Sequence, residues 1–477
     1  MVIQEEQHAA NTGNFWDETA DVIIVGSGFA GLSAAIESRN AGASVLVLEK
    51  MKALGGNSTI SDGGIAAPGT DMQLKNDIKD SADLMYGDMM RAGLGMNDSK
   101  LVRIVADHAC HAFEWSRDYL GVEYLDRVDQ FGGHCVPRCY TAKNVSGSTI
   151  IKRLVKKAHE VGVAIRTGVR FDDFVQDSTG RLTGVKARGN HTYHNPESGT
   201  VKFIQARKGI ILTAGGFAAD VPFRIMQDPR LTADIDTTNK PSATAEVIEA
   251  ALNAGAAAVD LPQIQLGPWA SPDEKGYGVG PFFSEYILFQ YGIIIDPATG
   301  DRFVNELADR KTLSDKILSK QHPCLGIADA LAVKESGWNI EESLRRGVVK
   351  TFESLHDYAN YYQISLKRLE KTIETFNRSF VQGVDHSFSK PLIDKACPIE
   401  HPPFYGMRLW PKVHYTMGGI KINSQGAVVD LHDQIIKGLY AAGEITGGIH
   451  GACRLGSCSI TECLVFGRLA GRHAAAE

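Results

Sequence analysis

The hydrophobic and polar positions of residues 21–49, DVIIVGSGFAGLSAAIESRNAGASVLVLE, predict a strand, a glycine-rich turn, a helix and a second strand. Both apolar runs are continuous, as in strands that are buried on both faces of a parallel sheet. Gly26 suits a tight turn, Gly28 allows close approach of the backbone, and Gly31 allows the helix to pack closely on the strand. This order, with the acidic end at Glu49, is typical of a βαβ unit that binds a dinucleotide.

The pattern continues with a helical periodicity, an alternating β-meander, a buried strand and a final helix, at residues 71–160, 162–189, 208–216 and 460–476. Pro- and Gly-rich segments at 261–280 and 395–419 are typical of crossings between domains. We therefore expect an α/β fold, in which a discontinuous Rossmann-like domain carries an inserted α+β capping domain. The expected parts are a leader (1–20), the nucleotide-binding domain (21–262 and 414–477) and the cap (263–413).

Composition narrows the class of protein. The chain has 477 residues, of which 43% are hydrophobic and 22% charged, and its net charge is −6. This balance does not favour nucleic acid or an anionic membrane as a partner. No apolar run reaches the roughly 18–20 residues of a membrane span. The sequence as written has a polar start, so we expect a cytoplasmic location, and a periplasmic one if a signal was removed. The eight cysteines form no CxxC motif, and no metal site is expected.

Further glycine-rich segments narrow the cofactor. GGNST (55–59), TAGGF (213–217) and AAGEITGG (441–448) would supply a second set of backbone contacts, which an extended FAD needs and a nicotinamide cofactor does not. With GDRFVNELADRKT, VHYTMGGIKI and GIHGACRLGSCSITECLVFGRLAG, these segments make nearly the whole chain resemble the fumarate reductase/succinate dehydrogenase flavoprotein family, in particular its soluble flavocytochrome c and urocanate reductase branch.

The resemblance implies FAD as cofactor. Membrane-bound relatives attach FAD to a His in the loop after the βαβ unit, where this chain has Ser58, so we expect non-covalent FAD. The implied contacts are Gly26, Gly28, Ala30, Gly31, Glu49, Lys50, Gly56, Asn57, Ser58, Gly63, Gly64, Phe171, Ala214, Gly215, Glu444, Arg454, Ser459 and Ile460.

The resemblance also assigns catalytic roles. Arg310 matches the arginine proton donor of the family, and Glu285 matches the glutamate that returns its proton. A second relay arginine is common three residues after that glutamate, but Leu288 stands there. His414 and Arg454 match the groups that bind and polarise the carboxylate of the substrate.

The substrate pocket departs from the pattern of fumarate reductases. In QLGPW (265–269), Gly267 stands in place of a His that binds the second carboxylate, and Trp269 stands in place of a Thr. We therefore expect an aromatic or bulky enoate, such as urocanate or a cinnamate, rather than fumarate. The residues expected around it are Ser284, which replaces a substrate-binding Thr, and Trp269, Tyr286 and Tyr140.

The leading hypothesis is an FAD-dependent ene-reductase that passes hydride from flavin N5 to the C=C bond of an α,β-unsaturated carboxylate, with Arg310 as proton donor. A fumarate reductase proper, a 3-ketosteroid-type dehydrogenase and a non-catalytic flavoprotein subunit remain as alternatives. The expected partners are the small unsaturated carboxylate and a separate electron donor, either a protein or a reduced small molecule. Neither nucleic acid nor a membrane span is expected.

Overall fold

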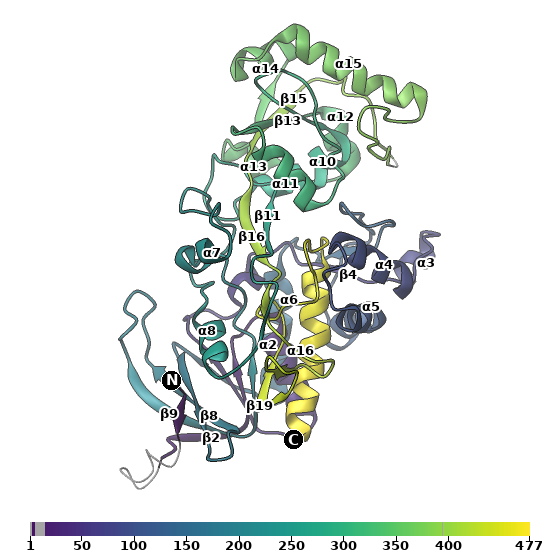
Figure 1. Ribbon diagram of the computed structural model, residues 1–477. Helices are drawn as coiled ribbons and strands as arrows, with labels where there is room; N and C mark the ends of the chain where they lie inside the picture. The colour runs from purple at the N-terminus through teal and green to yellow at the C-terminus, as the bar shows by residue number, and fades with distance from the viewer. Residues whose placement is uncertain (1, 5–14, 394) are drawn as a thin grey trace.

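The computed structural model describes residues 2–4, 15–393 and 395–477. Its lower part in Figure 1 is built on a large sheet and holds both marked termini, and its upper part is a smaller α+β lobe. The large sheet has the strand order β1–β7–β8–β9–β2–β3–β6, with β19 and β18 added beside β9. Its strands are β1 (Ile3–Gln4), β2 (Glu18–Val25), β3 (Val45–Glu49), β6 (Ala164–Thr167), β7 (Arg170–Gln176), β8 (Leu182–Gly189), β9 (Thr200–Leu212), β18 (Ala427–Val429) and β19 (Ile435–Ala441).

Strand β9 joins two kinds of sheet. Its first half pairs antiparallel with β8, and its second half pairs parallel with β2 and β19. Strands β3 and β6 extend the parallel part, so that β6, β3, β2, β9 and β19 all run in one direction. The parallel part is the predicted Rossmann-like unit, and β7 with β8 forms the predicted meander. The α/β fold class expected from the sequence is confirmed.

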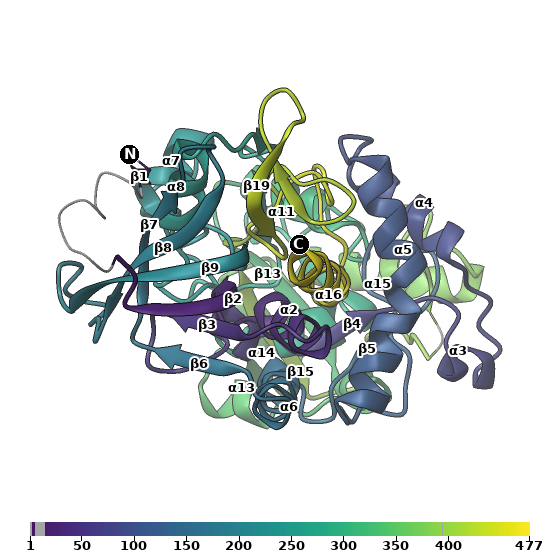
Figure 2. The same ribbon diagram turned by 90° about the horizontal axis from the view of Figure 1, so that it is seen from below.

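Two helices from opposite ends of the chain pack side by side, as Figure 2 shows: α2 (Phe29–Asn40) and α16 (Cys458–Ala476). A Cβ atom on Gly467 would lie 2.5 Å from the carbonyl oxygen of Ala30, and one on Gly471 would lie 2.4 Å from that of Ala34. The glycines therefore allow a helix contact that any larger residue would push apart. The contact brings the start of α16 close to the turn after β2, although some 430 residues separate them.

Further elements complete the lower part: η1 (Gly56–Thr59), β4 (Gly64–Ala66), α3 (Asp71–Lys75), α4 (Ala82–Ala92), α5 (Ser99–Glu114), a π-helical turn (Trp115–Tyr119), β5 (Cys139–Thr141), α6 (Gly147–Glu160), α7 (Val221–Gln227), α8 (Glu246–Asn253), β10 (Ala258–Val259) and β17 (Gly419–Ile420). Helices α3–α6 fall within the region 71–160 that the periodicity predicts as helical.

The upper lobe is built around an antiparallel sheet, β12–β13–β15–β14. Its elements are α9 (Gly280–Phe283), a π-helical turn (Ser284–Leu288), α10 (Phe289–Tyr291), β12 (Ile293–Ile295), α11 (Arg310–Leu318), β13 (Cys324–Asp329), α12 (Ala330–Ser336), α13 (Glu341–Arg345), β14 (Lys350–Phe352), α14 (Leu355–Tyr362), α15 (Leu366–Gln382) and β15 (Phe404–Leu409). The antiparallel pair β11 (Ile264–Gly267) and β16 (Lys412–Thr416) lies between the two parts. The domain boundaries predicted after residues 262 and 413 fall beside β11 and within β16.

The start of the chain differs from the expected leader. Residues Ile3–Gln4 form β1 beside β7, β2 begins at Glu18, and the ring of Phe15 lies 4.8 Å from that of Phe203. Strand β1 could not be predicted from the sequence, because two paired residues are too few to show a period. The rest of the predicted leader, residues 1 and 5–14, lies outside the described residues. None of the described helices is both long and apolar enough to cross a membrane.

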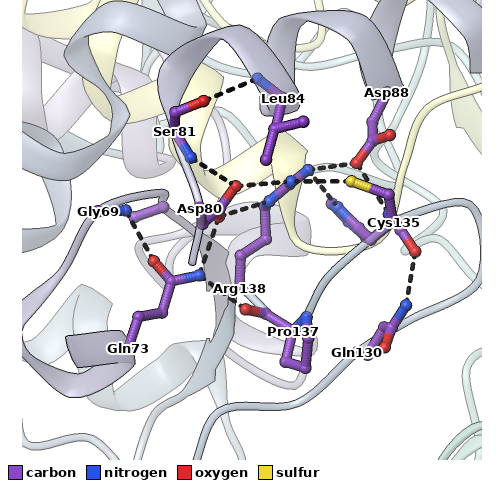
Figure 3. A network of polar contacts seen from close by, with 12 residues as sticks. Gly69, Gln73, Asp80, Ser81, Leu84, Asp88, Gln130, Cys135, Pro137 and Arg138 are labelled. Carbon is purple, nitrogen blue, oxygen red and sulfur yellow. Dashed lines mark hydrogen bonds and ion pairs between the residues drawn. The ribbon is translucent and has the colours of Figure 1, made fainter. Parts of the chain in front are cut away.

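A buried charge network holds the loop before β5, as Figure 3 shows. Arg138 is fully buried and donates to both carboxylate oxygens of Asp80, at 2.9 and 2.8 Å, and to Asp88 at 2.6 Å. The two carboxylates raise the pKa of Arg138 above its usual value against the opposing effect of burial. The network fixes residues 129–138, and the neighbouring Phe131 lies against Gly456 near the start of α16.

Candidate active site

One elongated cavity begins at the turn after β2 and ends beneath the upper lobe. Its wall includes residues from Val25 near the start of the chain to Cys463 near its end. Segments of the lower part line most of its length, and Trp269, Tyr277, Glu285 and Arg310 of the upper lobe close one end. The cavity thus has a long section formed largely by backbone and a short section crowded with charged side chains.

The turn after β2 can hold a pyrophosphate. Gly26 has a φ of 106°, and a Cβ there would lie 2.5 Å from the carbonyl oxygen of Thr213. A Cβ on Gly31 would lie 2.1 Å from the carbonyl oxygen of Gly26. Helix α2 therefore begins directly behind the turn and presents its N-terminal N–H groups to the cavity. Glu49 fixes the turn by accepting from the hydroxyl of Ser27 at 2.5 Å.

The residues expected to contact FAD gather along this cavity. All of them line it except Gly31, in the first turn of α2, and Gly63. Lys50 donates to the hydroxyl of Thr244 at 2.9 Å and so faces the end of the cavity near β3. At the other end, the N-terminus of α16 and Glu444 face the cavity, and burial raises the pKa of Glu444 to about 7. This extended cradle fits a long dinucleotide with phosphates at the helix end.

Arg310 and Glu285 form an ion pair at the upper end of the cavity, with side chains 13% and 10% exposed. Asp309 accepts from Thr312 N and so caps α11, which places Arg310 at the first helical position. Glu285 lies in the π-helical turn Ser284–Leu288, a distortion that is frequent at functional sites. Nη2 of Arg310 donates to Oε1 of Glu285 at 2.5 Å. Burial raises the pKa of Glu285 against the opposing effect of Arg310.

Arg454 and His414 form a second group, opposite the first. His414 lies on β16, and its Nδ1 is 2.8 Å from the hydroxyl of Thr238. Nη2 of Arg454 donates to Nε2 of His414 at 3.2 Å. Burial and then the charges of Arg454 and Arg310 hold the pKa of His414 well below its usual value. The ring is therefore neutral at pH 7, with Nε2 as acceptor and the proton on Nδ1.

Arg454 has no carboxylate partner among the described residues. It is 4% exposed, its Nε has no hydrogen-bond partner, and Nη1 donates to the carbonyl oxygen of Leu455 at 2.8 Å. The guanidinium also lies 4.6 Å from the ring centre of Tyr415. Burial and the nearby charge of Arg310 lower the pKa of Arg454. A buried cation without a counter-charge is costly, so this arrangement indicates a site for an anion.

Trp269 forms the wall between the two groups. Its ring centre lies 4.4 Å from the guanidinium of Arg310 and 4.6 Å from the ring centre of His414. The indole also folds over Gly267, where a Cβ would lie 3.0 Å from two of its atoms. Trp269 is 1% exposed. The indole therefore fills the space that a side chain at position 267 would occupy.

Three residues expected around the substrate lie outside this lining. Ser284 donates its hydroxyl to the carbonyl oxygens of Trp269 and Gly280. Tyr140 packs on Phe113, and its hydroxyl lies 2.5 Å from that of Thr70. The structure thus does not place Ser284 or Tyr140 at the substrate, because local partners hold both side chains.

Tyr286 is the third of these residues. It stacks on Trp338 and donates to Asp62 at 2.7 Å, so it meets the cavity only through that carboxylate. Asp62 itself lines the cavity.

Sequence reasoning missed several lining residues. Asp62, Thr238, Tyr277 and Tyr415 all line the charged end of the cavity. Burial, with Asp62 and Glu285 nearby, raises the pKa of Tyr277 well above its usual value, so its hydroxyl remains a neutral donor. Tyr277 lies in the Gly-rich crossing GYGVG, where the pattern indicates only a loop. Asp62 could have been predicted as a lining residue from the sequence, because it directly precedes the glycine pair Gly63–Gly64.

A Rossmann-like sheet with an extended dinucleotide cradle and a buried cluster of arginines defines a flavin-dependent oxidoreductase. Within the described residues, no group of three His, Cys, Asp or Glu side chains could hold a metal ion. The model of a family described as FAD binding domain matches residues 21–460. The chain belongs to this family, in its fumarate reductase and urocanate reductase branch. FAD is its cofactor, and it is an oxidoreductase that acts on CH–CH bonds.

Two curated relatives and one solved structure illustrate the relationship. The acrylate reductase flavoprotein subunit of Shewanella woodyi is 41% identical over 96% of this chain and 91% of its own length. The urocanate reductase of Eggerthella lenta is 33% identical over 96% of this chain and 74% of its own. The open conformation of a flavocytochrome c3 fumarate reductase superposes with a TM-score of 0.77, at 30% identity over 99% of this chain and 80% of that one.

Proposed function

We propose that the protein reduces the C=C bond of a small α,β-unsaturated monocarboxylate, of the size of acrylate. The observation that carries this proposal is the indole of Trp269 folded over Gly267. With Gly267 in place of the His of fumarate reductases, the protein has no side chain at this position to bind a second carboxylate. The indole of Trp269 fills the space that the missing side chain would leave. A dicarboxylate therefore lacks a binding group, and a bulky tail lacks room. The acrylate reductase relative supports the same conclusion.

This proposal replaces the bulky substrate expected from the sequence. That expectation treated Trp269 as a wall around an enlarged pocket, because the sequence does not reveal the direction of its side chain. In the structure the indole lies between Arg310 and His414 and is almost fully buried. Urocanate and cinnamate would have to displace it.

In the proposed reaction, Arg454 binds the substrate carboxylate. Its guanidinium can donate two parallel hydrogen bonds, and the bound anion would supply the counter-charge that the protein leaves out. His414 orients Arg454 through Nε2, and Thr238 fixes the ring of His414 in turn. As negative charge moves onto the carboxylate during reduction, this buried cation stabilises it more strongly than it stabilises the ground state.

Proton transfer falls to Arg310 and Glu285. Reduced FAD supplies the hydride for the carbon remote from the carboxylate when it is bound in the cradle. Arg310 protonates the carbon next to the carboxylate, and Glu285, 2.5 Å away, returns a proton to Arg310. Because a guanidinium is a weak acid, the transfer requires the close carboxylate partner that the structure provides. Non-covalent attachment of FAD and a separate electron donor remain predictions from the sequence.

An anionic substrate is favoured over a neutral ketone. The cavity is lined by Arg310 and by the buried Arg454, and the described residues offer Arg454 no carboxylate. A ketosteroid would leave that charge unpaired. The likeness to 3-ketosteroid-Δ4-(5α)-dehydrogenase from Rhodococcus jostii, at 23% identity and a TM-score of 0.78, concerns the fold alone.

The test is anaerobic reoxidation of the reduced holoenzyme by acrylate, fumarate, urocanate and cinnamate. We expect acrylate to reoxidise the flavin fastest. The double variant Gly267→His/Trp269→Thr should shift the preference towards fumarate, whereas Tyr140→Phe, a change outside the cavity, should not. Faster reoxidation by urocanate or cinnamate than by acrylate would contradict the small-substrate proposal. Flavin that no enoate reoxidises faster than buffer does would contradict the reductase function itself.

A further inference from the structure

A small second cavity lies behind the wall formed by Trp269, Glu285 and Arg310. These three side chains line both cavities, and Gln130, Gln290 and Glu306 contribute to the lining of the second one. It has about 20 Å³ of room for the centre of a water molecule. Since one water needs roughly 10–15 Å³ on this measure, the cavity accommodates a single water.

Two buried donors on this cavity have no protein partner in the described part of the chain. Nε2 of Gln290, a residue 7% exposed, and Nε1 of Trp269, a residue 1% exposed, make no hydrogen bond. A buried donor without a partner costs about 1–3 kcal/mol, and ordered water is the usual solution. Glu285 adds an acceptor, because Arg310 occupies only its Oε1. A water there would have the two to four polar partners that a buried water requires.

This chain lacks the arginine that the family resemblance leads one to expect as a second proton carrier beside Glu285. Leu288 stands where a relay arginine is common, and it is fully buried. Its side chain packs against Gly292 and Gly326, where added Cβ atoms would lie 2.8 and 2.1 Å from it. Leu288 thus belongs to the packing of the upper lobe and cannot pass a proton to Glu285.

We propose that a water in the second cavity delivers protons from solvent to Glu285, and that Gln290 is the positioning residue that holds this water. The inference rests on the proposed role of Arg310 as proton donor. Gln130 and Gly132 line the cavity and are partly exposed, and the proposed path to solvent runs beside them. The amide of Gln290 and the indole N–H donate to the water oxygen, so that a water hydrogen is directed at Glu285.

In each turnover, one proton passes along this route from solvent to the substrate carbon. Arg310 begins as a guanidinium beside the ionised Glu285 and gives its proton to the substrate carbon. The water then transfers a proton to Glu285 and regains one from a solvent hydronium ion at the rim. Glu285 passes the proton to Arg310, which restores the starting state. No electrons move along this path.

The test compares Gln290→Met with Leu313→Met in the holoenzyme. Methionine keeps most of the volume of glutamine but removes the amide, and Leu313 lines the same cavity without a polar group. Because Arg310 begins protonated, the first turnover of pre-reduced Gln290→Met with acrylate should proceed at the wild-type rate. Steady-state kcat should fall roughly tenfold, since proton return becomes limiting. Its solvent deuterium isotope effect should rise, and KM should fall in proportion to kcat, because a slow step after the chemistry leaves kcat/KM unchanged. Leu313→Met should resemble the wild type.

Two results would overturn the inference. If the first turnover of Gln290→Met slows as much as the steady state, the residue has a structural role. If neither rate changes, the water is not on the proton path. A parallel Arg310→Lys variant distinguishes a failure of the proposed water path from a failure of the proposed role of Arg310 as proton donor. If its first turnover is as fast as that of the wild type, Arg310 is not the donor, whatever the result for Gln290. FAD content confirms that each variant is folded.

Discussion

Two buried arginines in this protein meet the cost of burial in opposite ways. Arg138 is fully buried and pairs with Asp80 and Asp88, and Arg454 is 4% exposed and pairs with no carboxylate among the described residues. The pKa of Arg138 is raised by its two partners, and the pKa of Arg454 is lowered by burial and by Arg310. The charge of Arg138 is therefore neutralised by side chains of the protein, whereas that of Arg454 is left for a bound anion to neutralise.

The comparison separates structural from functional charge. A buried ion pair with complete partners holds its surroundings in place, and the loss of one member leaves the others uncompensated. A buried cation without a partner destabilises the fold, so a functional role is the usual reason for its presence. At Arg454 the reason that we propose is the substrate carboxylate. The exposed fractions of Arg138 and Arg454 are similar, so burial alone does not distinguish the two roles.

The largest effect is expected from Arg138→Met. The substitution leaves Asp80 and Asp88 buried and unpaired, and the breaking of such a pair costs about 3–5 kcal/mol. Denaturant unfolding should show a loss of this size. A triple variant that also carries Asp80→Asn and Asp88→Asn should recover much of it. If Arg138→Met were as stable as the wild type, the network would not have the structural role assigned to it.

Arg454→Met should have the reverse profile. We expect the free energy of unfolding to stay equal or rise, because an uncompensated charge is removed. Turnover with acrylate should fall by about 10²–10³, the cost of losing one group that stabilises an oxyanion in a buried site. Steady-state kinetics and denaturant unfolding of the same preparation measure both quantities. A variant that lost stability but kept its turnover would assign Arg454 to the same class as Arg138.

His134 connects the two regions and gives the smallest predicted effect. Its Nδ1 lies 3.3 Å from Arg138, and its Nε2 lies 2.9 Å from the carbonyl oxygen of Gly456, two residues after Arg454. Burial, and then Arg138, lower the pKa of His134 to about 4. The unfolded chain binds this proton near pH 6.5 and the folded protein only near pH 4. Stability is therefore complete above pH 6.5 and is lost as the pH falls towards 4.

The pH dependence can be isolated with His134→Gln, whose amide can still donate to Gly456. Between pH 7.5 and 4, the wild type should lose on the order of 3 kcal/mol more than this variant. Urea unfolding at a series of pH values measures the difference. Parallel curves for the two proteins would show that His134 does not titrate in this range.

The sequence predicts the cofactor half of the site better than the substrate half. The turn at Gly26–Gly31 depends on residues that are neighbours in the sequence, so the local pattern alone is enough to predict it. The partners of Arg138 lie 50 and 58 residues away, and no periodicity connects them. The lesson of Trp269 is sharper. The sequence shows that residue 269 is a tryptophan, but the direction of its indole depends on packing between β11, α11 and β16. The pocket that we propose is therefore smaller than the one expected from the sequence.

The contact between α2 and α16 has a consequence for how the protein is made. The cofactor cavity needs Gly26 from the start of the chain and Ser459 and Ile460 from its end. A ribosome delivers the first of these long before the last. A nascent chain that lacks α16 consequently has an incomplete cradle and an uncovered face on α2, where Ala30 and Ala34 wait for Gly467 and Gly471. We therefore expect FAD to bind only after α16 has been made, and a chain truncated before α16 to bind no FAD.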